Sequence, residues 1–173
     1  MSRNGGGGRL RVRFALERLP NFARALLELT HHALRAMRAS GSGGIVNVAS
    51  IASFQPVAGL ATYAASKAFV LSLSESLWSE ERESGVRVLA LCPGRTPTEF
   101  QAIAGTGSAD GAFGVRSADQ VVAAALAALE RGRSYEVPGL ENWLATWLVR
   151  LLPRSAVTRA VKKLVRRAAE KKL

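Results

Sequence analysis

The chain has 173 residues, of which 48% are hydrophobic, a formal net charge of +11 and a single cysteine, Cys92. This length predicts one domain with its own core, and one cysteine excludes an intramolecular disulfide. No apolar run is long enough to span a membrane, and no hydrophobic segment of a secretory signal follows the first arginines. We therefore expect a cytoplasmic protein. Its basic residues gather at the two ends, where they would attract polyanions.

The first predicted helix covers residues 21–39, after an arginine- and glycine-rich N-terminus over residues 1–20 that we expect to be flexible. Apolar residues recur in this helix with a period near 3.6, as expected for one buried face. Its histidines, His31 and His32, have no further ligands at metal-binding spacing. We therefore expect surface histidines and no metal site.

The rest of the chain alternates short apolar strands with helices. That order predicts an α/β fold with a parallel sheet of about three strands and right-handed crossovers. Ser117 and Gln120 predict a capping box at the start of one of the helices. The elements expected in chain order are a strand over residues 45–49, a helix over 62–83, a strand over 86–92, a helix over 118–131 and a strand over 134–137.

Residues 139–173 are expected to form a basic amphipathic helical tail. Trp143, Trp147 and neighbouring leucines predict an apolar helix up to Pro153, and the helix after it carries valines on one face and basic residues on the other. Such a helix suits the surface of an anionic bilayer. The alternative is a helix packed on the protein body with a solvated basic face. Nucleic-acid binding is disfavoured because few aromatic residues lie among the basic ones.

Ser50, Tyr63 and Lys67 are the candidate catalytic residues. Ser50 ends the predicted strand, and Tyr63 and Lys67 stand four positions apart, on one face of the next helix. A free tyrosine has a pKa of about 10, and a nearby lysine cation favours the phenolate. A serine hydroxyl can hold a substrate oxygen while charge develops on it. Together the three side chains predict proton exchange with a carbonyl or alcohol oxygen.

Each of these residues also has an ordinary structural role. A tyrosine and a lysine at this spacing are common as a half-buried ring beside a solvated ammonium group. A serine after a strand often caps a turn or a helix. The joint pattern favours the catalytic interpretation over these roles.

The segment GGIVNVASIASFQPVAGLATYAASK, with serine 13 positions before tyrosine and the block YAASKA, resembles the active-site region of the short-chain dehydrogenase/reductase family. A second segment, VRVLALCPGRTPTEF, resembles that family's strand followed by Pro-Gly and a threonine. The tail is similar to that of bacterial ketoacyl-reductase-like members. The resemblance implies that residues 21–138 are the C-terminal part of a Rossmann-type domain, with about three strands of its parallel sheet.

The resemblance also implies the roles of particular residues. Tyr63 would exchange the proton, Ser50 would hold the substrate oxygen, and Lys67 would bond the nicotinamide ribose. The loop over residues 102–114 would cover an apolar substrate, the alternative being a plain surface loop. The family commonly forms dimers through the helices over residues 21–39 and 62–83. NAD or NADP would be the cofactor, and its binding residues would be Tyr63, Lys67, Pro93, Gly94, Thr96 and Thr98.

Two features of the family are not found at their usual places. The glycine-rich turn that carries the dinucleotide phosphates would precede this segment, and the run Gly5–Gly8 lacks its spacing and its preceding strand. The family's proton-relay asparagine falls on Phe22. The adjacent Asn21 serves if the alignment shifts by one residue, and otherwise it caps a helix after Pro20.

Two functional hypotheses follow. The first is an NAD(P)-dependent oxidoreductase acting on a carbonyl or alcohol substrate of apolar, acyl or lipid-like character. The second is a truncated, catalytically inactive module that binds a partner or a membrane surface. The missing glycine-rich turn distinguishes them, because without phosphate contacts the nicotinamide would be poorly oriented. The sequence gives no preference between NAD and NADP.

Overall fold

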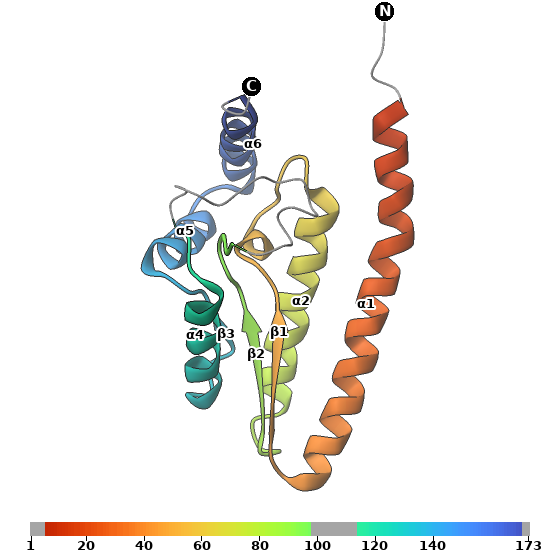
Figure 1. The fold of residues 1–173 in the computed structure, drawn as a ribbon, viewed down its shortest axis with the longest axis vertical. Coiled ribbons are helices and arrows are strands. Elements are labelled where there is room, and N and C mark those ends of the chain that lie inside the picture. Colours follow the sequence, from red (N-terminus) through yellow and green to blue (C-terminus); the bar gives the residue numbers. More distant parts are fainter. Residues whose placement is uncertain (1–5, 98–113, 171–173) are drawn as a thin grey trace, which may run out of the picture.

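The computed structural model describes residues 6–97 and 114–170, with side chains from residue 19 onward and, after the gap, up to residue 163. Figure 1 shows the elements in chain order. They are α1 (Gly6–Ser40), β1 (Gly43–Val48), the 3-10 helix η1 (Ile51–Phe54), α2 (Ala61–Glu80), β2 (Val86–Leu91), α4 (Ala118–Glu130), β3 (Tyr135–Glu136), α5 (Leu140–Leu151) and α6 (Arg154–Glu170).

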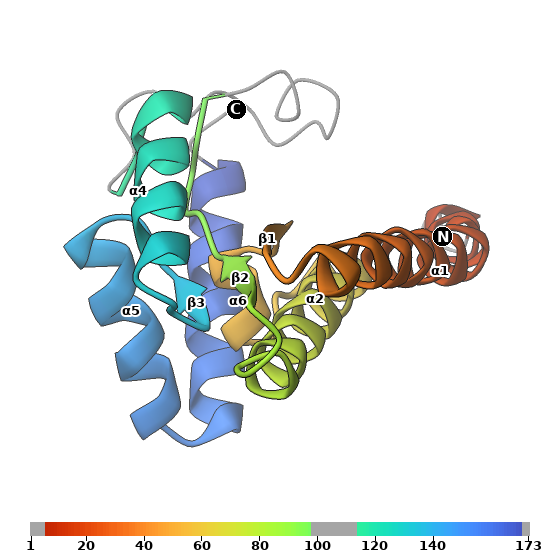
Figure 2. The ribbon, with the colours of Figure 1, turned by 90° about the horizontal axis from the view of Figure 1, so that it is seen from below.

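The three strands form one parallel sheet in the order β1-β2-β3. Ile45 of β1 is in register with Val88 of β2, and Ala90 of β2 is in register with Tyr135 of β3. Helix α2 lies against one face of the sheet and α4 against the other, while α1 runs beside α2 (Figures 1 and 2). The α/β class and the parallel sheet of three strands are therefore confirmed.

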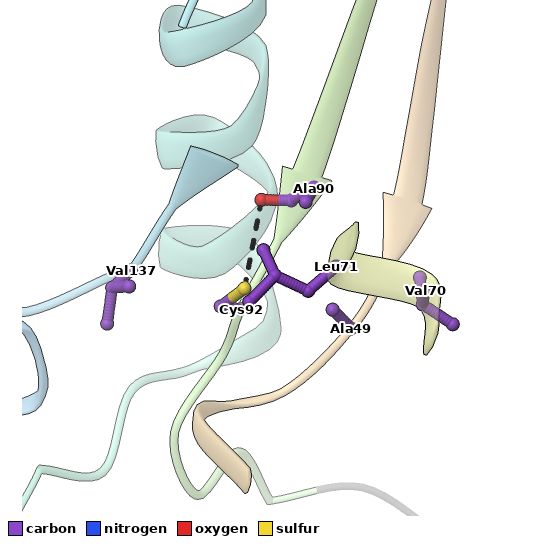
Figure 3. Packing of buried hydrophobic residues seen from close by; sticks show 6 residues of the cluster. All are labelled: Ala49, Val70, Leu71, Ala90, Cys92 and Val137. Carbon is purple, nitrogen blue, oxygen red and sulfur yellow. Dashed lines mark hydrogen bonds between the residues drawn. The ribbon is translucent and has the colours of Figure 1, made fainter. Parts of the chain in front are cut away.

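Strand β2 lies in the middle of the sheet, and from Val88 to Leu91 its side chains are apolar on both faces. Such a continuous apolar run is typical of parallel strands covered by helices on both sides. Alternate residues of a strand point to opposite faces, so Ala90 and Cys92 belong to one core cluster and Leu89 and Leu91 to another. Figure 3 shows the first cluster, in which Ala90 and Cys92 lie close to Leu71 of α2.

The predicted capping box starts α4 as expected. The Ser117 hydroxyl accepts a hydrogen bond from the backbone N–H of Gln120, and the Gln120 side chain accepts one from the backbone N–H of Ser117. These reciprocal bonds satisfy donors that a helix N-terminus otherwise leaves unpaired. The capping box thus fixes the start of α4 directly after Ser117.

Helix α1 differs most from the sequence-based expectation. We expected a flexible segment over residues 1–20 and a helix from Asn21, but α1 already begins at Gly6 and includes Pro20. The arginines, leucines and alanines of this segment are good helix formers. A proline inside a helix removes one hydrogen bond without always ending the helix.

The C-terminal part of α1 is fixed to the protein body. Leu34 is buried with Val86 and Val88 of β2. Arg38 donates two hydrogen bonds to the carboxylate of Glu81, which follows α2 and is only 1% exposed. The hydrogen bond from Arg38 holds the pKa of Glu81 below its usual range. A buried carboxylate is tolerated here because it is paired.

Candidate active site

The site lies where β1 ends and α2 begins. Ser50 comes two residues after β1 and is 8% exposed. Its hydroxyl accepts a hydrogen bond from the backbone N–H of Ala52 over 3.1 Å, and so caps η1. The ordinary capping role is thus present. A hydroxyl that accepts one bond can still donate another, so capping leaves Ser50 able to hold a substrate oxygen.

Tyr63 and Lys67 lie on the first two turns of α2, and both are half-buried. The Lys67 ammonium is 5.9 Å from the centroid of the Tyr63 ring. The expected juxtaposition of a phenol and an ammonium is therefore seen in the structure. Burial lowers the pKa of Lys67, since removal from water disfavours its charged form.

Lys67 is also tied to the chain on both sides of Ser50. Its ammonium donates a hydrogen bond of 2.8 Å to the carbonyl of Val48, at the end of β1. Its own carbonyl accepts a hydrogen bond of 2.8 Å from the hydroxyl of Ser53, in η1. These two bonds fix the turn that carries Ser50 against the helix that carries Lys67 and Tyr63. The strand, the turn and the helix thus form one unit.

Helix α1 brings an aromatic side chain to this unit. The Phe22 ring lies with its centroid 5.7 Å from the Lys67 ammonium, a distance typical of cation–π contacts. Asn21 is exposed at the adjacent position. In the sequence, the family's asparagine position falls on Phe22, and in the structure Phe22 lies beside Lys67. The assignment of Asn21 to a proton relay stays a prediction.

The segment after β2 completes the site from the other side. The carbonyl of Pro93 accepts a hydrogen bond of 3.1 Å from the backbone N–H of Ile51, which directly follows Ser50. Pro93, Gly94 and Thr96 are all half-buried. The predicted cofactor segment is therefore bonded to the predicted catalytic turn. Thr98 and residues 102–113 of the expected substrate loop lie outside the described residues.

Asn142 of α5 holds this segment, although sequence reasoning gave it no role. It is 7% exposed, and its side-chain amide donates to the carbonyls of Gly114 (3.0 Å) and Pro138 (2.9 Å). It also packs on Gly94, where an added Cβ would come within 2.5 Å of its Nδ2 atom. Asn142 and Thr146, four residues apart and both buried, form a polar stripe on the inner side of α5. That stripe was the available sequence signal.

Cys92 directly follows β2 and is fully buried. Burial raises its pKa to about 12, so it stays a thiol at neutral pH. Figure 3 shows Cys92 among the apolar side chains of its core cluster.

Residues 21–108 match the sequence model of the family described as short chain dehydrogenase, which is just over half of the chain. The chain belongs to the short chain dehydrogenase family. This confirms the resemblance. The residues expected to act, Ser50, Tyr63 and Lys67, all lie within the matched region.

Individual relatives agree with the family assignment. A cis-4-hydroxycyclohexanecarboxylate dehydrogenase from Sinomonas cyclohexanicum is 45% identical over 71 residues, covering 41% of this chain and 28% of its own. A ketoacyl reductase from Nostoc sp. is 30% identical over 128 residues, covering 74% of this chain and 44% of its own. The chain therefore spans less than half the length of these two curated relatives.

A solved structure extends the similarity to most of the fold. The short-chain dehydrogenase from Sphingobium yanoikuyae, in complex with NADPH, superposes with a TM-score of 0.69 at 32% identity. The superposition covers 87% of this chain and 60% of that one. The three-stranded sheet and its helices thus have the arrangement of a short chain dehydrogenase.

Proposed function

We propose that this protein takes part in NAD(P)-dependent oxidation or reduction of an alcohol or carbonyl group on a small apolar molecule. The observation that carries the proposal is the joining of Tyr63, Lys67 and the Ser50 turn into one unit by the bonds of Lys67 to Val48 and Ser53. The family membership and the NADPH bound to the Sphingobium relative support it.

The donors at the site suit the nicotinamide half of such a cofactor. The Lys67 ammonium, the Ser50 turn and the segment from Pro93 to Thr96 lie at the carboxyl ends of β1 and β2, where α/β sheets bind ligands. Lys67 would bond the ribose, and the Pro93–Thr96 segment, with Thr98, would face the carboxamide. When bound, the cofactor supplies or accepts the hydride.

The residues of this chain would handle the oxygen and the proton of the substrate. Tyr63 would donate a proton to the carbonyl oxygen in reduction and remove it from the hydroxyl in oxidation. The cation of Lys67 would stabilise the phenolate that remains. Ser50 would donate a hydrogen bond to the same oxygen, where it helps most as negative charge builds up.

An apolar, acyl-like substrate is supported by the similarity of this chain to the ketoacyl reductase from Nostoc sp.. A homodimer through α1 and α2 is supported by the exposure of Leu27 and Leu29 on α1. Sedimentation velocity would test the homodimer. The wild type should sediment as a dimer, whereas Leu29→Arg should sediment as a monomer because it places a positive charge on the dimer face.

The proposal is tested first by titrating the protein with NADPH and NADH while following tryptophan fluorescence. Saturable binding is expected. A folded protein that binds neither nucleotide would contradict the proposal and favour the inactive module, because the site would then lack the cofactor it needs.

The second test compares two single-oxygen deletions. Tyr63→Phe should lower kcat by about 100-fold to 10,000-fold, since proton transfer contributes that much, while nucleotide binding persists. The protein has one other tyrosine, Tyr135, so Tyr135→Phe is the matched control and should keep near-normal activity. Equal activity of the two variants in turnover of a panel of ketones would rule out the proton-transfer role.

A further inference from the structure

The outward face of α5 exposes an unusual number of large apolar side chains. Asn142 and Thr146 are buried against the protein body, while Leu151, on the opposite side, is 76% exposed. The exposed set includes Trp143, Leu144, Trp147, Leu148, Leu151 and Leu152. A hollow of about 430 Å³ on this face is lined by Leu140, Glu141, Leu144, Ala145 and Leu148. Contiguous exposed apolar surface of this kind marks an interaction site.

Helix α6, which follows after Pro153, has the opposite character. Val157 is buried and Val161 is half-buried, so this face turns toward the protein. The exposed positions include Arg159, Lys162 and Lys163. From Arg154 to the C-terminus the sequence has eight basic residues and one acidic residue. Over residues 154–163 the outer face of α6 is therefore a cationic surface.

These two surfaces meet at the α5–α6 turn. Leu151 and Leu152 are separated from Arg154 only by Pro153, and all four residues are exposed. Figure 2 shows the two helices as a hairpin whose turn protrudes at the edge of the molecule. An apolar tip is thus placed directly beside a cationic helix.

The charge and the apolar side chains together identify the occupant. A second copy docked through this face would place another basic α6 beside the exposed Arg159, Lys162 and Lys163. A nucleic acid would pair with the charges but leave the leucines in water. An anionic bilayer offers negative headgroups to α6 and acyl chains to the leucines, and tryptophans favour its interface.

We propose that the α5–α6 hairpin docks the protein peripherally on an anionic lipid bilayer. The apolar tip, Leu148, Leu151 and Leu152, enters the headgroup and acyl boundary, and the basic face of α6 binds the headgroups. In the described ranges no helix is both long and apolar enough to cross a bilayer. The hairpin lies on the membrane surface, and this docking is independent of cofactor binding.

Flotation with phospholipid vesicles tests the proposal on the full chain. The protein should float with phosphatidylcholine vesicles containing phosphatidylglycerol and partition at least about tenfold less onto pure phosphatidylcholine, since each basic residue near an anionic surface adds to binding. Equal partitioning onto both vesicle types, or none onto either, would overturn the proposal.

Paired variants distinguish binding through this surface from binding through the overall charge or hydrophobicity of the protein. Leu148→Ser/Leu151→Ser and Lys162→Glu/Lys163→Glu should each weaken binding by about tenfold or more. Two controls make the same changes at exposed positions elsewhere: Val122→Ser/Leu126→Ser on α4, and Arg35→Glu/Arg131→Glu on α1 and after α4. The controls should bind as the wild type does, and circular dichroism verifies that all four variants fold. Equal losses in variants and controls would mean that the hairpin is not the docking site.

Insertion is measured separately from charge attraction. Lipids brominated high on the acyl chain should quench tryptophan fluorescence, and Trp143→Phe/Trp147→Phe should remove most of that quenching. Absence of quenching would overturn insertion of the tip. Insertion would also be overturned if added RNA displaced the wild type and every variant from the vesicles to the same extent, because the bound protein would then be held by charge alone. A dimer that Leu148→Ser/Leu151→Ser dissociates, without any vesicle binding, would assign the face to a second copy instead.

Discussion

Lys67 shows how its surroundings set the state of one side chain. The carbonyl of Val48 accepts from its ammonium, the ring of Phe22 lies against it, and burial lowers its pKa. The first two contacts favour the cation, and burial opposes it. The net effect is an ammonium held in one place beside Tyr63, which a solvated lysine would not give.

The lowered pKa of Lys67 predicts a pH dependence of stability. Between its folded pKa and about 10.4 in the unfolded chain, the unfolded state binds more protons. The contribution of Lys67 to the free energy of unfolding therefore rises with pH in this window. Lys67→Met should lack that rise, as measured by urea unfolding from neutral to alkaline pH.

The control for this prediction is Lys162→Met, which removes an exposed lysine and should keep the rise. Cys92, whose raised pKa of about 12 acts in the opposite direction, is present in all three proteins and cancels in the comparison. Parallel pH profiles for the wild type and Lys67→Met would show that burial of Lys67 has no energetic consequence.

At the scale of elements, α5 is fixed to the site by Asn142. Its amide bonds the carbonyls of Gly114 and Pro138 and packs on Gly94. A second link joins Arg116 to Glu141, with 2.7 Å between their charged atoms. The first turn of α5 thus connects the segment after β2 to the segment before α4.

Asn142→Ala should lower the free energy of unfolding by about 1–3 kcal/mol, because two buried carbonyls lose their donor. Asn21→Ala, at an exposed position, should change it by less than about 0.5 kcal/mol. Urea denaturation of both variants measures the difference. Similar small losses in both would mean that water or a neighbouring group replaces the amide.

At the scale of the whole molecule, stability depends on covering both faces of β2. Leu89 is fully buried and packs with Val121, Ala125 and Ala128 of α4. On the opposite face Val88 packs with Leu34 of α1. Parallel strands need such cover on both sides, so the helices and the sheet stabilise each other.

Leu89→Ala should therefore cost about 3 kcal/mol in free energy of unfolding, the range for a buried leucine that leaves a cavity. Leu126→Ala makes the same chemical change at a 53% exposed position of α4 and should cost less than about 0.5 kcal/mol. Thermal and urea unfolding of the two variants would measure both values. A cost below about 1 kcal/mol for Leu89→Ala would show that the core collapses around the gap.

The sequence predicted those parts of the fold that depend on local rules. The apolar run of β2, the alternation of strands and helices, and the Ser117–Gln120 capping box each reflect hydrogen bonding or periodicity within a few residues. The start of α1 was not predicted, because glycines and Pro20 weaken a helix without forbidding it. The candidate catalytic set was found because its spacing is local to one strand, one turn and one helix.

The sequence by itself therefore determined the family, the α/β class, and the presence of Ser50, Tyr63 and Lys67 on consecutive elements. Only the tertiary structure decided what surrounds them, because those contacts join residues far apart in the chain. Phe22 reaches Lys67 from α1, and Asn142 reaches Gly94 from α5. The structure also exposed the apolar side of α5, since burial depends on which face meets the protein body.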